Sequence, residues 1–407
     1  MRVVSSKLCV RCKGYKYLCG LSACPIIIRF RSMMDAISNV KNRDIISGST
    51  PPSIIVGEKG YPKVNIIFNL PPNIYGDSAK EYENPQGWWG RKSLGDIIKL
   101  RSYMVSSIIK NINVNDPLTL YNNEIALAGI SQSSVTSEVK IEKILDLKLK
   151  FDGIITPIGP LSLAEYIKIE DNPKISKIFD KIIFDDVKAT EAVKELYQKN
   201  ENYYTIINAF SLGLLGFKKN RKIVPTRWAI SAVDNIVGEM LYKKVKNFKE
   251  IEKINLFLSG YLGNNFFILL YPSKINFIWI EIWHPNSLWS NEVVVTELEE
   301  DYKGNYEYFD GGFMAARVGV LEYLSRISRQ AGCIVVREIT SSYYAPVGNW
   351  HIRETVRNAF LTNPIHFDKL SDAIAYIQNS INIKINLYQL KSIKRILYQK
   401  QITDYLS

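Results

Sequence analysis

The stretch Asn264–His284, NNFFILLYPSKINFIWIEIWH, contains two strongly apolar runs separated by a Pro-Ser-Lys turn. Both runs are rich in aromatic and β-branched residues, which favour pleated strands over helices. A short turn between two such runs predicts antiparallel strands. The stretch therefore places a β-sheet in the second half of the chain.

Strand-like and helix-like segments alternate on both sides of this stretch, which predicts a mixed α/β (α+β) fold. On the N-terminal side we expect a strand at 62–72, a helix at 93–112, a strand at 151–158 and a helix at 185–199. On the C-terminal side, a helix and the strand CIVVREI precede three further helices. We expect four parts: a four-cysteine zinc-binding head (1–30), a mixed sheet-and-helix body (31–300), a largely helical C-terminal region (301–398) and a tail (399–407).

Charge and cysteine usage limit the class of protein. Among the 407 residues, Lys and Arg number 52 against 40 Asp and Glu, a net charge of +12 that is typical of proteins that meet phosphate. No apolar segment is long and unbroken enough to span a bilayer, and the N-terminus lacks the apolar core of a signal peptide. Four of the five cysteines lie in one short segment, which is not the distribution of a disulfide framework. We expect a cytoplasmic protein that does not enter a membrane.

The four clustered cysteines predict a metal site. Cys9, Cys12, Cys19 and Cys24 form a C-x2-C-x6-C-x4-C array. Two thiolates from a C-x2-C turn and a second pair from a nearby loop can enclose one Zn²⁺ ion as a closed tetrahedron. An iron–sulfur cluster remains the alternative. A closed site has no open position for catalysis, so we expect structural zinc.

The tail QKQITDYLS carries a spaced set of anchors. One helical turn brings Ile402, Tyr405 and Leu406 to one side, and Gln399 can occupy a separate polar pocket. The spacing matches the Q-x-x-[ILM]-x-x-[FY]-[FYL] box by which replication and repair proteins bind the sliding clamp, PCNA. The alternative is a chance match in a chain rich in Ile and Tyr.

Two further blocks are candidates for DNA binding. Lys218, Lys219, Arg221 and Lys222 lie on a loop before a helix that begins near Thr226 and carries Arg227, which suits phosphate contacts. Exposed Tyr343 and Tyr344 precede a helix with Trp350, Arg353 and Arg357, and aromatic residues interleaved with Arg suit stacking on unpaired bases. The alternatives are a solvated loop and aromatics that cover the core.

Several ionisable residues are candidates for catalysis. Strand alternation puts Trp279, Glu281 and Trp283 on one face, where Glu281 is either desolvated with a raised pKa or a hydrogen-bonded core acid. An enzyme acting on DNA or a nucleotide, by nuclease or nucleotidyl or ribosyl chemistry, would use a cleft shared by Asp234, Glu281, Arg337 and Glu338. With only three histidines in the chain, a His-based catalytic metal site is not expected.

Six blocks together resemble the archaeal Nre family of DNA-repair proteins. They are CVRCKGYKYLCGLSACPI, VGEKGYPKVN, DIIKLRS, GFKKNRKIVPTRWAISAVD, WIEIWHPNSLW and REITSSYYAPVGNWHIRE. The resemblance implies an Nre N-terminal-type domain at 31–300, an Nre C-terminal-type domain at 301–398, and repair beside the clamp, in some members with excision-repair proteins. It implies no catalytic mechanism. The leading interpretation is a repair factor that is recruited to PCNA and binds damaged or branched DNA. The enzyme and an adaptor without DNA contact are the alternatives.

Overall fold

The computed structural model describes most of the chain, and the described residues form two compact units. The described residues are 11–20, 24–40, 43–145, 158–287, 290–306, 308 and 310–398. The N-terminal unit comprises Cys24–Met240 with Pro346–Gly348, and the C-terminal unit comprises the described residues of Leu241–Ala345, Asn349–Ser407 and Met1–Ala23. The chain passes from one unit to the other inside one helix, α11 (Thr226–Val245).

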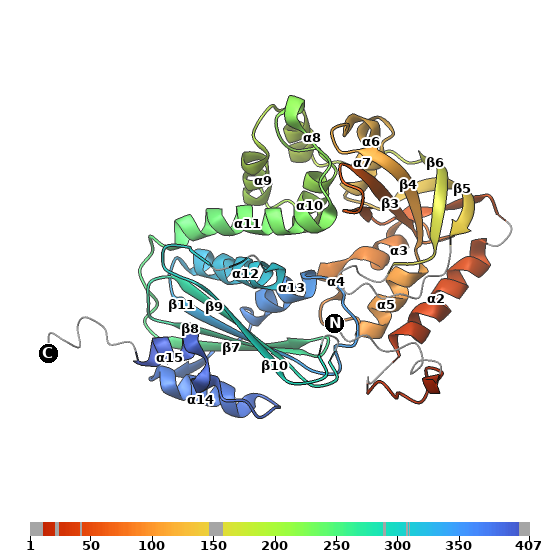
Figure 1. The fold of residues 1–407 in the computed structure, drawn as a ribbon. Coiled ribbons are helices and arrows are strands. Elements are labelled where there is room, and N and C mark those ends of the chain that lie inside the picture. Colours follow the sequence, from red (N-terminus) through yellow and green to blue (C-terminus); the bar gives the residue numbers. More distant parts are fainter. Residues whose placement is uncertain are drawn as a thin grey trace. The chain divides into compact units, whose positions relative to one another are not determined.

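The stretch Asn264–His284 supplies two strands of a six-stranded sheet in the C-terminal unit (Figure 1). The strands are β7 (Ile254–Tyr261), β8 (Asn264–Tyr271), β9 (Asn276–Trp283), β10 (Val294–Glu300), β11 (Gly332–Ile339) and β12 (Ile365–Phe367). Their order is β10-β9-β11-β8-β7-β12, and every neighbouring pair is antiparallel except β9 and β11. The two predicted strands are confirmed and run in opposite directions. They are not neighbours, because β11 pairs with both of them.

β11 occupies a central place in this sheet because it can be buried along its whole length. Every residue from Gly332 to Ile339 is buried, and the apolar run before Arg337 is typical of a strand that is covered on both faces. A side chain at Gly332 would overlap the ring of Tyr271 on the neighbouring strand, so a glycine is needed there. The sequence of β8 and β9 alone could not indicate that a distant strand separates them.

Helices cover both faces of the sheet (Figure 1). They are α12 (Gly311–Ile327), α13 (Trp350–Ala359), α14 (Leu370–Ser380) and α15 (Lys391–Tyr398), with the 3₁₀ turn η3 (Leu387–Gln389) before α15. Ile278, Ile280 and Ile282 of β9 face α14 and α15, while Trp279 of the same strand faces α12. The predicted alternation of β9 is confirmed. The C-terminal region is largely helical, as expected, but it also supplies the central strand.

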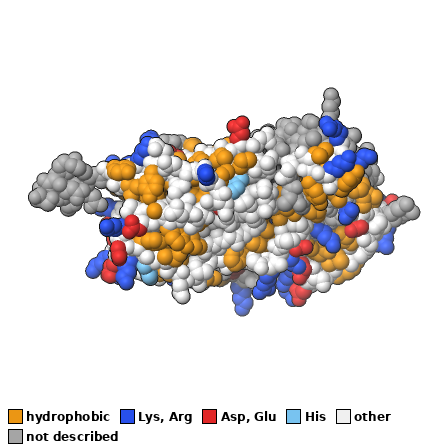
Figure 2. Space-filling view, turned by 90° about the horizontal axis from the view of Figure 1, so that it is seen from below, with side chains coloured by type: hydrophobic (Ala, Val, Ile, Leu, Met, Phe, Trp, Pro, Cys, Tyr) orange, Lys and Arg blue, Asp and Glu red, His pale blue; other side chains and the backbone are white. Residues whose placement is uncertain are grey.

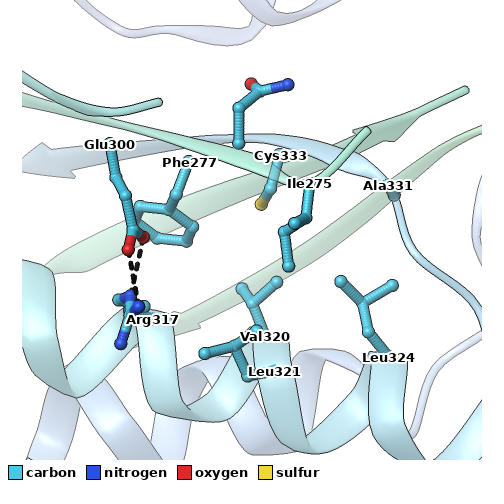
Figure 3. A pocket seen from close by; sticks show the side chains of 10 residues that line it. Ile275, Phe277, Glu300, Arg317, Val320, Leu321, Leu324, Ala331 and Cys333 are labelled. Atoms are coloured by element: carbon cyan, nitrogen blue, oxygen red, sulfur yellow. Dashed lines mark hydrogen bonds and ion pairs between the residues drawn. The ribbon is translucent and has the colours of Figure 1, made fainter. Parts of the chain in front are cut away.

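A buried ion pair joins β10 to α12. Arg317 Nη2 and Nε lie 2.5 and 2.6 Å from the two carboxylate oxygens of Glu300, and both side chains are at most 3% exposed. A cavity beside the pair, about large enough for one water molecule, is lined mainly by apolar side chains such as Phe277 and Val320 (Figure 3). Because both side chains are buried, this bidentate contact compensates the two charges, and the Tyr242 ring also lies over the guanidinium at 5.4 Å.

The N-terminal unit contains a second six-stranded sheet, ordered β1-β5-β6-β4-β3-β2, in which β4 and β6 are parallel. Its strands are β1 (Ile45–Thr50), β2 (Ile54–Val56), β3 (Lys63–Leu70), β4 (Val105–Asn113), β5 (Val135–Leu145) and β6 (Leu161–Ile169). Its first helices are α2 (Pro25–Val40), α3 (Asp77–Lys80), η1 (Glu81–Glu83), α4 (Pro85–Trp88), α5 (Leu94–Tyr103), α6 (Leu118–Asn122) and α7 (Ile125–Gly129). The later ones are α8 (Lys177–Phe184), α9 (Ala189–Gln198), α10 (Tyr203–Ser211), η2 (Lys218–Asn220) and most of α11. The mixed α/β class is confirmed.

The predicted helix at 93–112 is wrong in its second half. Ser93 and Asp96 form a capping box that starts α5, with Asp96 N donating to Ser93 Oγ over 3.2 Å and Ser93 N donating to Asp96 Oδ2 over 2.9 Å. The helix ends at Tyr103, and Val105–Asn113 forms β4 between β3 and β6. The β-branched residues of this half fit a strand once partner strands are available.

Two other expectations are tested only in part. The predicted strand at 151–158 lies outside the described residues apart from Ile158. The helix predicted at 185–199 is confirmed as α9, which begins later, at Ala189. Among the helices that the structure describes, none combines the length and apolarity needed to cross a bilayer.

We predict that Glu300→Ala destabilises the C-terminal unit by about 3–5 kcal/mol, because it leaves the Arg317 charge buried without its carboxylate. Glu299→Ala is the matched control, since Glu299 pairs with Arg395 over 2.8 Å at a more exposed site and should cost less than about 1 kcal/mol. Urea unfolding followed by tryptophan fluorescence measures both. Equal losses for the two variants would contradict the role given to the buried pair.

Candidate functional site

Arg337 and Glu338 are adjacent in β11, and both are buried. Successive residues of a strand point to opposite faces of the sheet. The guanidinium of Arg337 therefore lies on the α13 face, whereas the carboxylate of Glu338 lies on the α14 face, as their hydrogen-bond partners confirm. The expectation that the two side chains share one cleft is wrong for this reason.

Arg337 is the centre of a polar network on the α13 face. Its Nη1 lies 2.6 Å from Glu281 Oε1, its Nε donates to Asn264 Oδ1 over 2.9 Å, and its Nη2 lies 3.2 Å from His351 Nε2. The rings of Phe266, Trp283 and Tyr343 surround the guanidinium at 5.6–6.0 Å. All three nitrogens of the guanidinium thus have protein partners, and aromatic faces contribute cation–π attraction.

The sequence left two alternatives for Glu281, a desolvated acid with a raised pKa and a hydrogen-bonded acid of the core, and the structure combines them. Burial raises the pKa of its carboxyl group, and the neighbouring Arg337 charge opposes that rise. Trp283 Nε1 donates to Glu281 Oε2 over 3.4 Å, and the nearby Asp310 charge also raises the pKa. Glu281 is therefore a desolvated acid that is also an ion-paired part of the core. Its shortest hydrogen bond is with Arg337.

Glu338 is fully buried and accepts several hydrogen bonds on the α14 face. Asn265 Nδ2 donates over 2.7 Å and His284 Nε2 lies 2.8 Å away. Asn382, which follows α14, donates from its backbone N over 2.7 Å and from Nδ2 over 3.0 Å. A carboxylate bound by this many donors is held in place by the fold, and these bonds tie the segment after α14 to the sheet.

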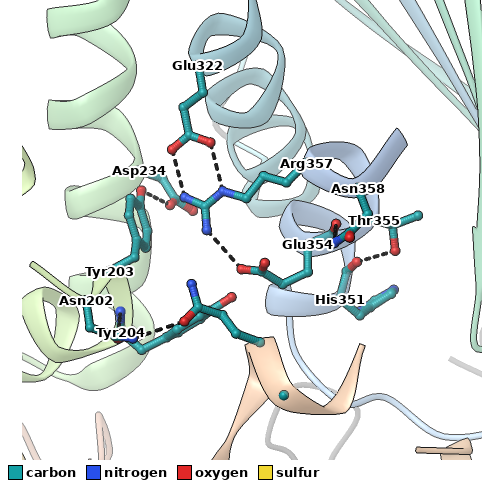
Figure 4. Close-up of polar contacts among 12 residues, drawn as sticks. Asn202, Tyr203, Tyr204, Asp234, Glu322, His351, Glu354, Thr355, Arg357 and Asn358 are labelled. Atoms are coloured by element: carbon teal, nitrogen blue, oxygen red, sulfur yellow. Dashed lines mark hydrogen bonds and ion pairs between the residues drawn. The ribbon is translucent and has the colours of Figure 1, made fainter. Parts of the chain in front are cut away.

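Asp234 lies on α11 in the N-terminal unit and is buried. The hydroxyl of Tyr203 donates to Asp234 Oδ1 over 2.6 Å (Figure 4). Arg227, on the same helix, is exposed and lies 3.5 Å from Glu58. Asp234 and Arg227 therefore do not share a site, although their spacing of seven residues allowed it. Among the described residues, no three or more His, Cys, Asp or Glu side chains are grouped so as to hold a metal ion.

The predicted aromatic and arginine block of α13 is buried. Tyr343 is 4% exposed and Tyr344 is 9% exposed, so the expectation that both are exposed is wrong. Trp350 and Arg353 are likewise buried, because α13 and the segment before it lie against the sheet. A base cannot stack on these rings without disrupting the core.

Arg357 is bound by carboxylates of its own unit. Its Nε and Nη2 bind the two oxygens of Glu322 at 2.8 and 2.7 Å, and its Nη1 lies 2.9 Å from Glu354 Oε1 (Figure 4). A bidentate Arg–carboxylate contact is among the stronger side-chain interactions. The contact joins α12 to α13 and occupies the guanidinium that we had considered for DNA.

The basic loop of the N-terminal unit divides into exposed lysines and one arginine that braces the fold. Lys218, Lys219 and Lys222 are exposed. Arg221 is half-buried and donates to the backbone carbonyls of Gly216 (2.9 Å), Ile183 (2.8 Å) and Asp185 (3.2 Å). Burial lowers its pKa, with the Asp186 charge opposing. Only the lysines of this loop are available to a phosphate backbone.

Positive charge alone does not mark a site. On the face shown in Figure 2, Lys and Arg side chains are spread among apolar and neutral surface. The net charge of +12 therefore does not by itself locate a binding site, and each basic side chain has to be judged by its own contacts. The exposed lysines of residues 218–222 have an acidic neighbour in the fold, because Lys218 N donates to Asp186 Oδ1 over 2.7 Å.

Three of the four clustered cysteines are described, while Cys9 lies outside the described residues. Hydrogen bonding from the backbone of Leu18 lowers the pKa of the Cys12 thiol, and backbone groups from three nearby residues add to this. Backbone amides directed at a sulfur favour the thiolate that zinc binds. Cys12, Cys19 and Cys24 are free of disulfides. In the described part of the chain, these three cysteines are not grouped so as to hold a metal ion.

The predicted clamp-binding anchors Gln399, Ile402, Tyr405 and Leu406 lie outside the described residues. The structure describes the chain as far as Tyr398, the last residue of α15.

Sequence reasoning missed Asn264, Asn265 and Asn382, which complete the two networks around β11. Asparagine is common in turns, so the sequence contained no signal that would have distinguished these three.

Comparison with known proteins gives a consistent match over most of the chain. The family models for archaeal Nre, N-terminal, and archaeal Nre, C-terminal, match residues 18–290 and 300–405. The chain is 36% identical to the DNA repair protein NreA of Archaeoglobus fulgidus, over 92% of this chain and 94% of that protein. It is 31% identical to DNA repair protein NreB of the same organism (94% and 96% covered) and 29% identical to NreA of Haloferax volcanii (93% and 93%). No solved structure gives a significant match.

Proposed function

Because the chain belongs to the archaeal Nre family, we propose that it is a DNA-repair factor that binds the sliding clamp through its C-terminal box and damaged or branched DNA through its N-terminal unit. The resemblance found in the sequence is confirmed by the match of both Nre regions. The similar proteins are named DNA repair proteins, and this observation carries the repair role. Clamp binding and DNA binding are supported by particular residues.

The exposed lysines of the loop at 218–222 support the DNA contact. The side chains of Lys218, Lys219 and Lys222 are exposed to solvent. Arg221 fixes the loop by its hydrogen bonds to backbone carbonyls. Lysines on a fixed loop can neutralise phosphates and release their counterions without reading sequence. Such contacts suit a protein that must act at lesions in any sequence.

We predict that Lys218→Ala, Lys219→Ala and Lys222→Ala together weaken binding to a forked DNA and lower the salt dependence of the affinity by about 0.9 in log–log slope for each lost phosphate contact. Fluorescence anisotropy over a salt series measures both. The same triple substitution at the exposed Lys243, Lys244 and Lys246 is the control for charge alone. If the two triple variants behave alike, the loop is not a DNA contact.

The position of α15 supports the clamp-binding role. Ile393 is buried against the sheet, Ser392 Oγ donates to Glu297 Oε2 over 2.6 Å, and Arg395 pairs with Glu299 over 2.8 Å. These contacts fix the helix to β10, and the box begins at the next residue after α15. Each buried apolar anchor of the box contributes roughly 1.5–3 kcal/mol to clamp binding before the cost of ordering the segment.

We predict that deleting residues 399–407 abolishes binding to the clamp and leaves the thermal unfolding temperature unchanged, because the described contacts that hold α15 come from Ser392, Ile393 and Arg395. Tyr405→Ala with Leu406→Ala should lose nearly as much, since these residues supply most of the apolar area. Lys400→Ala with Thr403→Ala, at positions between the anchors, is the matched control. Calorimetric titration of the clamp compares the four proteins, and equal affinities for all would refute the box.

We further propose that Cys9, Cys12, Cys19 and Cys24 hold one structural Zn²⁺ ion, which the lowered pKa of Cys12 supports. Elemental analysis should give about one zinc per chain, and Cys9→Ser with Cys24→Ser should remove it. Cys333→Ala should keep it, because that thiol is buried in β11. Iron with visible absorption in place of zinc would favour the cluster alternative.

A further inference from the structure

Two sequence blocks far apart in the chain lie side by side in the N-terminal unit. The turn between β2 and β3, residues 57–62, lies beside the segment 222–228 that leads into α11. Val114 connects them, since its N donates to Pro62 O over 3.0 Å and its O accepts from Ile223 N over 2.8 Å. Val56 N also donates to Thr226 Oγ1 over 2.8 Å. Both segments belong to sequence blocks that resemble the Nre family, and in the fold they form one surface.

This surface presents two aromatic side chains to solvent. Tyr61 is 47% exposed and Trp228 is 46% exposed, and their ring centroids lie 5.3 Å apart with the planes inclined at 45°. Gly60 has a φ of 88°, and Lys63 N donates to Gly60 O over 2.9 Å, so the turn that carries Tyr61 is closed and well defined. Large aromatics usually bury most of their area. About half of the surface of each residue therefore stays in contact with solvent, where a ligand can reach it.

The charges around the pair are mostly positive. Lys59 and Lys222 are exposed residues of the same two segments, and the exposed Lys63 directly follows the turn at 57–62. Arg227 lies 3.5 Å from Glu58, and both side chains are about half exposed, so this ion pair is weak and can open for a phosphate. Aromatic faces flanked by lysine and arginine are the arrangement by which proteins hold single-stranded nucleic acid.

We propose that Tyr61 and Trp228 form a stacking site for unpaired DNA bases, with Lys59, Lys63 and Lys222 on the adjacent phosphates. The site rests on the proposed function, since it names the part of a damaged or branched DNA that the N-terminal unit binds. Duplex bases are stacked on each other and do not offer their faces, so the site distinguishes unpaired from paired DNA. It replaces the aromatic block of α13, whose rings are buried.

The test compares three ligands by fluorescence anisotropy with the full-length protein. They are a labelled oligo(dT), an abasic oligomer with the same number of phosphates, and a duplex. Tyr61→Ala with Trp228→Ala should weaken oligo(dT) binding about five- to 100-fold and leave abasic binding unchanged, because the lost interaction is with the bases. The salt slope should stay the same, because no charge is removed.

Two matched variants separate stacking from a general effect on the fold. Tyr61→Phe with Trp228→Phe keeps an aromatic ring at both positions and should bind oligo(dT) within about twofold of the unmodified protein. Tyr75→Ala removes a comparably exposed ring, 50% exposed, from another part of the same unit and should have no effect. Thermal unfolding of each variant confirms that the fold is kept.

The outcomes are decisive. One outcome is that the double alanine variant binds oligo(dT) with the same affinity as the unmodified protein, with both proteins also binding the duplex. In that case the stacking site is wrong, but the proposed DNA binding is kept. Equal losses for oligo(dT) and the abasic oligomer would also overturn stacking. If the unmodified protein binds none of the three ligands, DNA binding and the stacking site fail together. An oligouridylate RNA is added as a fourth ligand, and tighter binding of this RNA than of oligo(dT) would overturn DNA as the ligand.

Discussion

Two adjacent charges in the most buried strand of the C-terminal sheet must both be compensated inside the protein. Because a strand turns Arg337 and Glu338 to opposite faces, one compensating set cannot serve both. Arg337 is matched by Glu281, Asn264 and His351, from β9, β8 and α13. Glu338 is matched by groups from β8, the end of β9 and the segment after α14. Both helical layers are thereby tied to one strand.

This constraint changes how the ionisable residues of the chain should be interpreted. Glu281, Arg337 and Glu338 looked like catalytic candidates because charged groups next to apolar runs are expensive to bury and often functional. In the structure each has protein partners that fit its charge, and the same is true of Asp234 and Tyr203. Their burial is explained by the stability of the fold. The exposed lysines and aromatic rings of the proposed DNA contacts lie in the N-terminal unit.

Aromatic side chains are also divided between the buried core and the exposed surface. Trp279, Trp350 and Tyr343 are buried against the sheet of the C-terminal unit, although the sequence around Tyr343 looked exposed. Tyr61 and Trp228 stay half in water on a closed turn and at the start of a long helix. Residue type does not separate the two groups, and Tyr343 and Trp350 have polar neighbours in the sequence, as Tyr61 and Trp228 do. What differs is whether a helix packs over them, which decides whether a ring contributes to the core or to a surface.

The amino-acid sequence by itself determined the mixed α/β class, helices such as α9, α12 and α14, the alternation of β9 and the family, because these depend on local periodicity and on blocks that are read directly along the chain. It could not place β11 between β8 and β9, and it could not show that β4 interrupts the predicted helix at 93–112, because strand pairing depends on partners distant in sequence. Burial of Tyr343 and exposure of Trp228 were likewise decided only by tertiary packing, as was the meeting of Tyr61 with Trp228. Local composition sets what a segment can form, and long-range contacts select which faces of it remain in water.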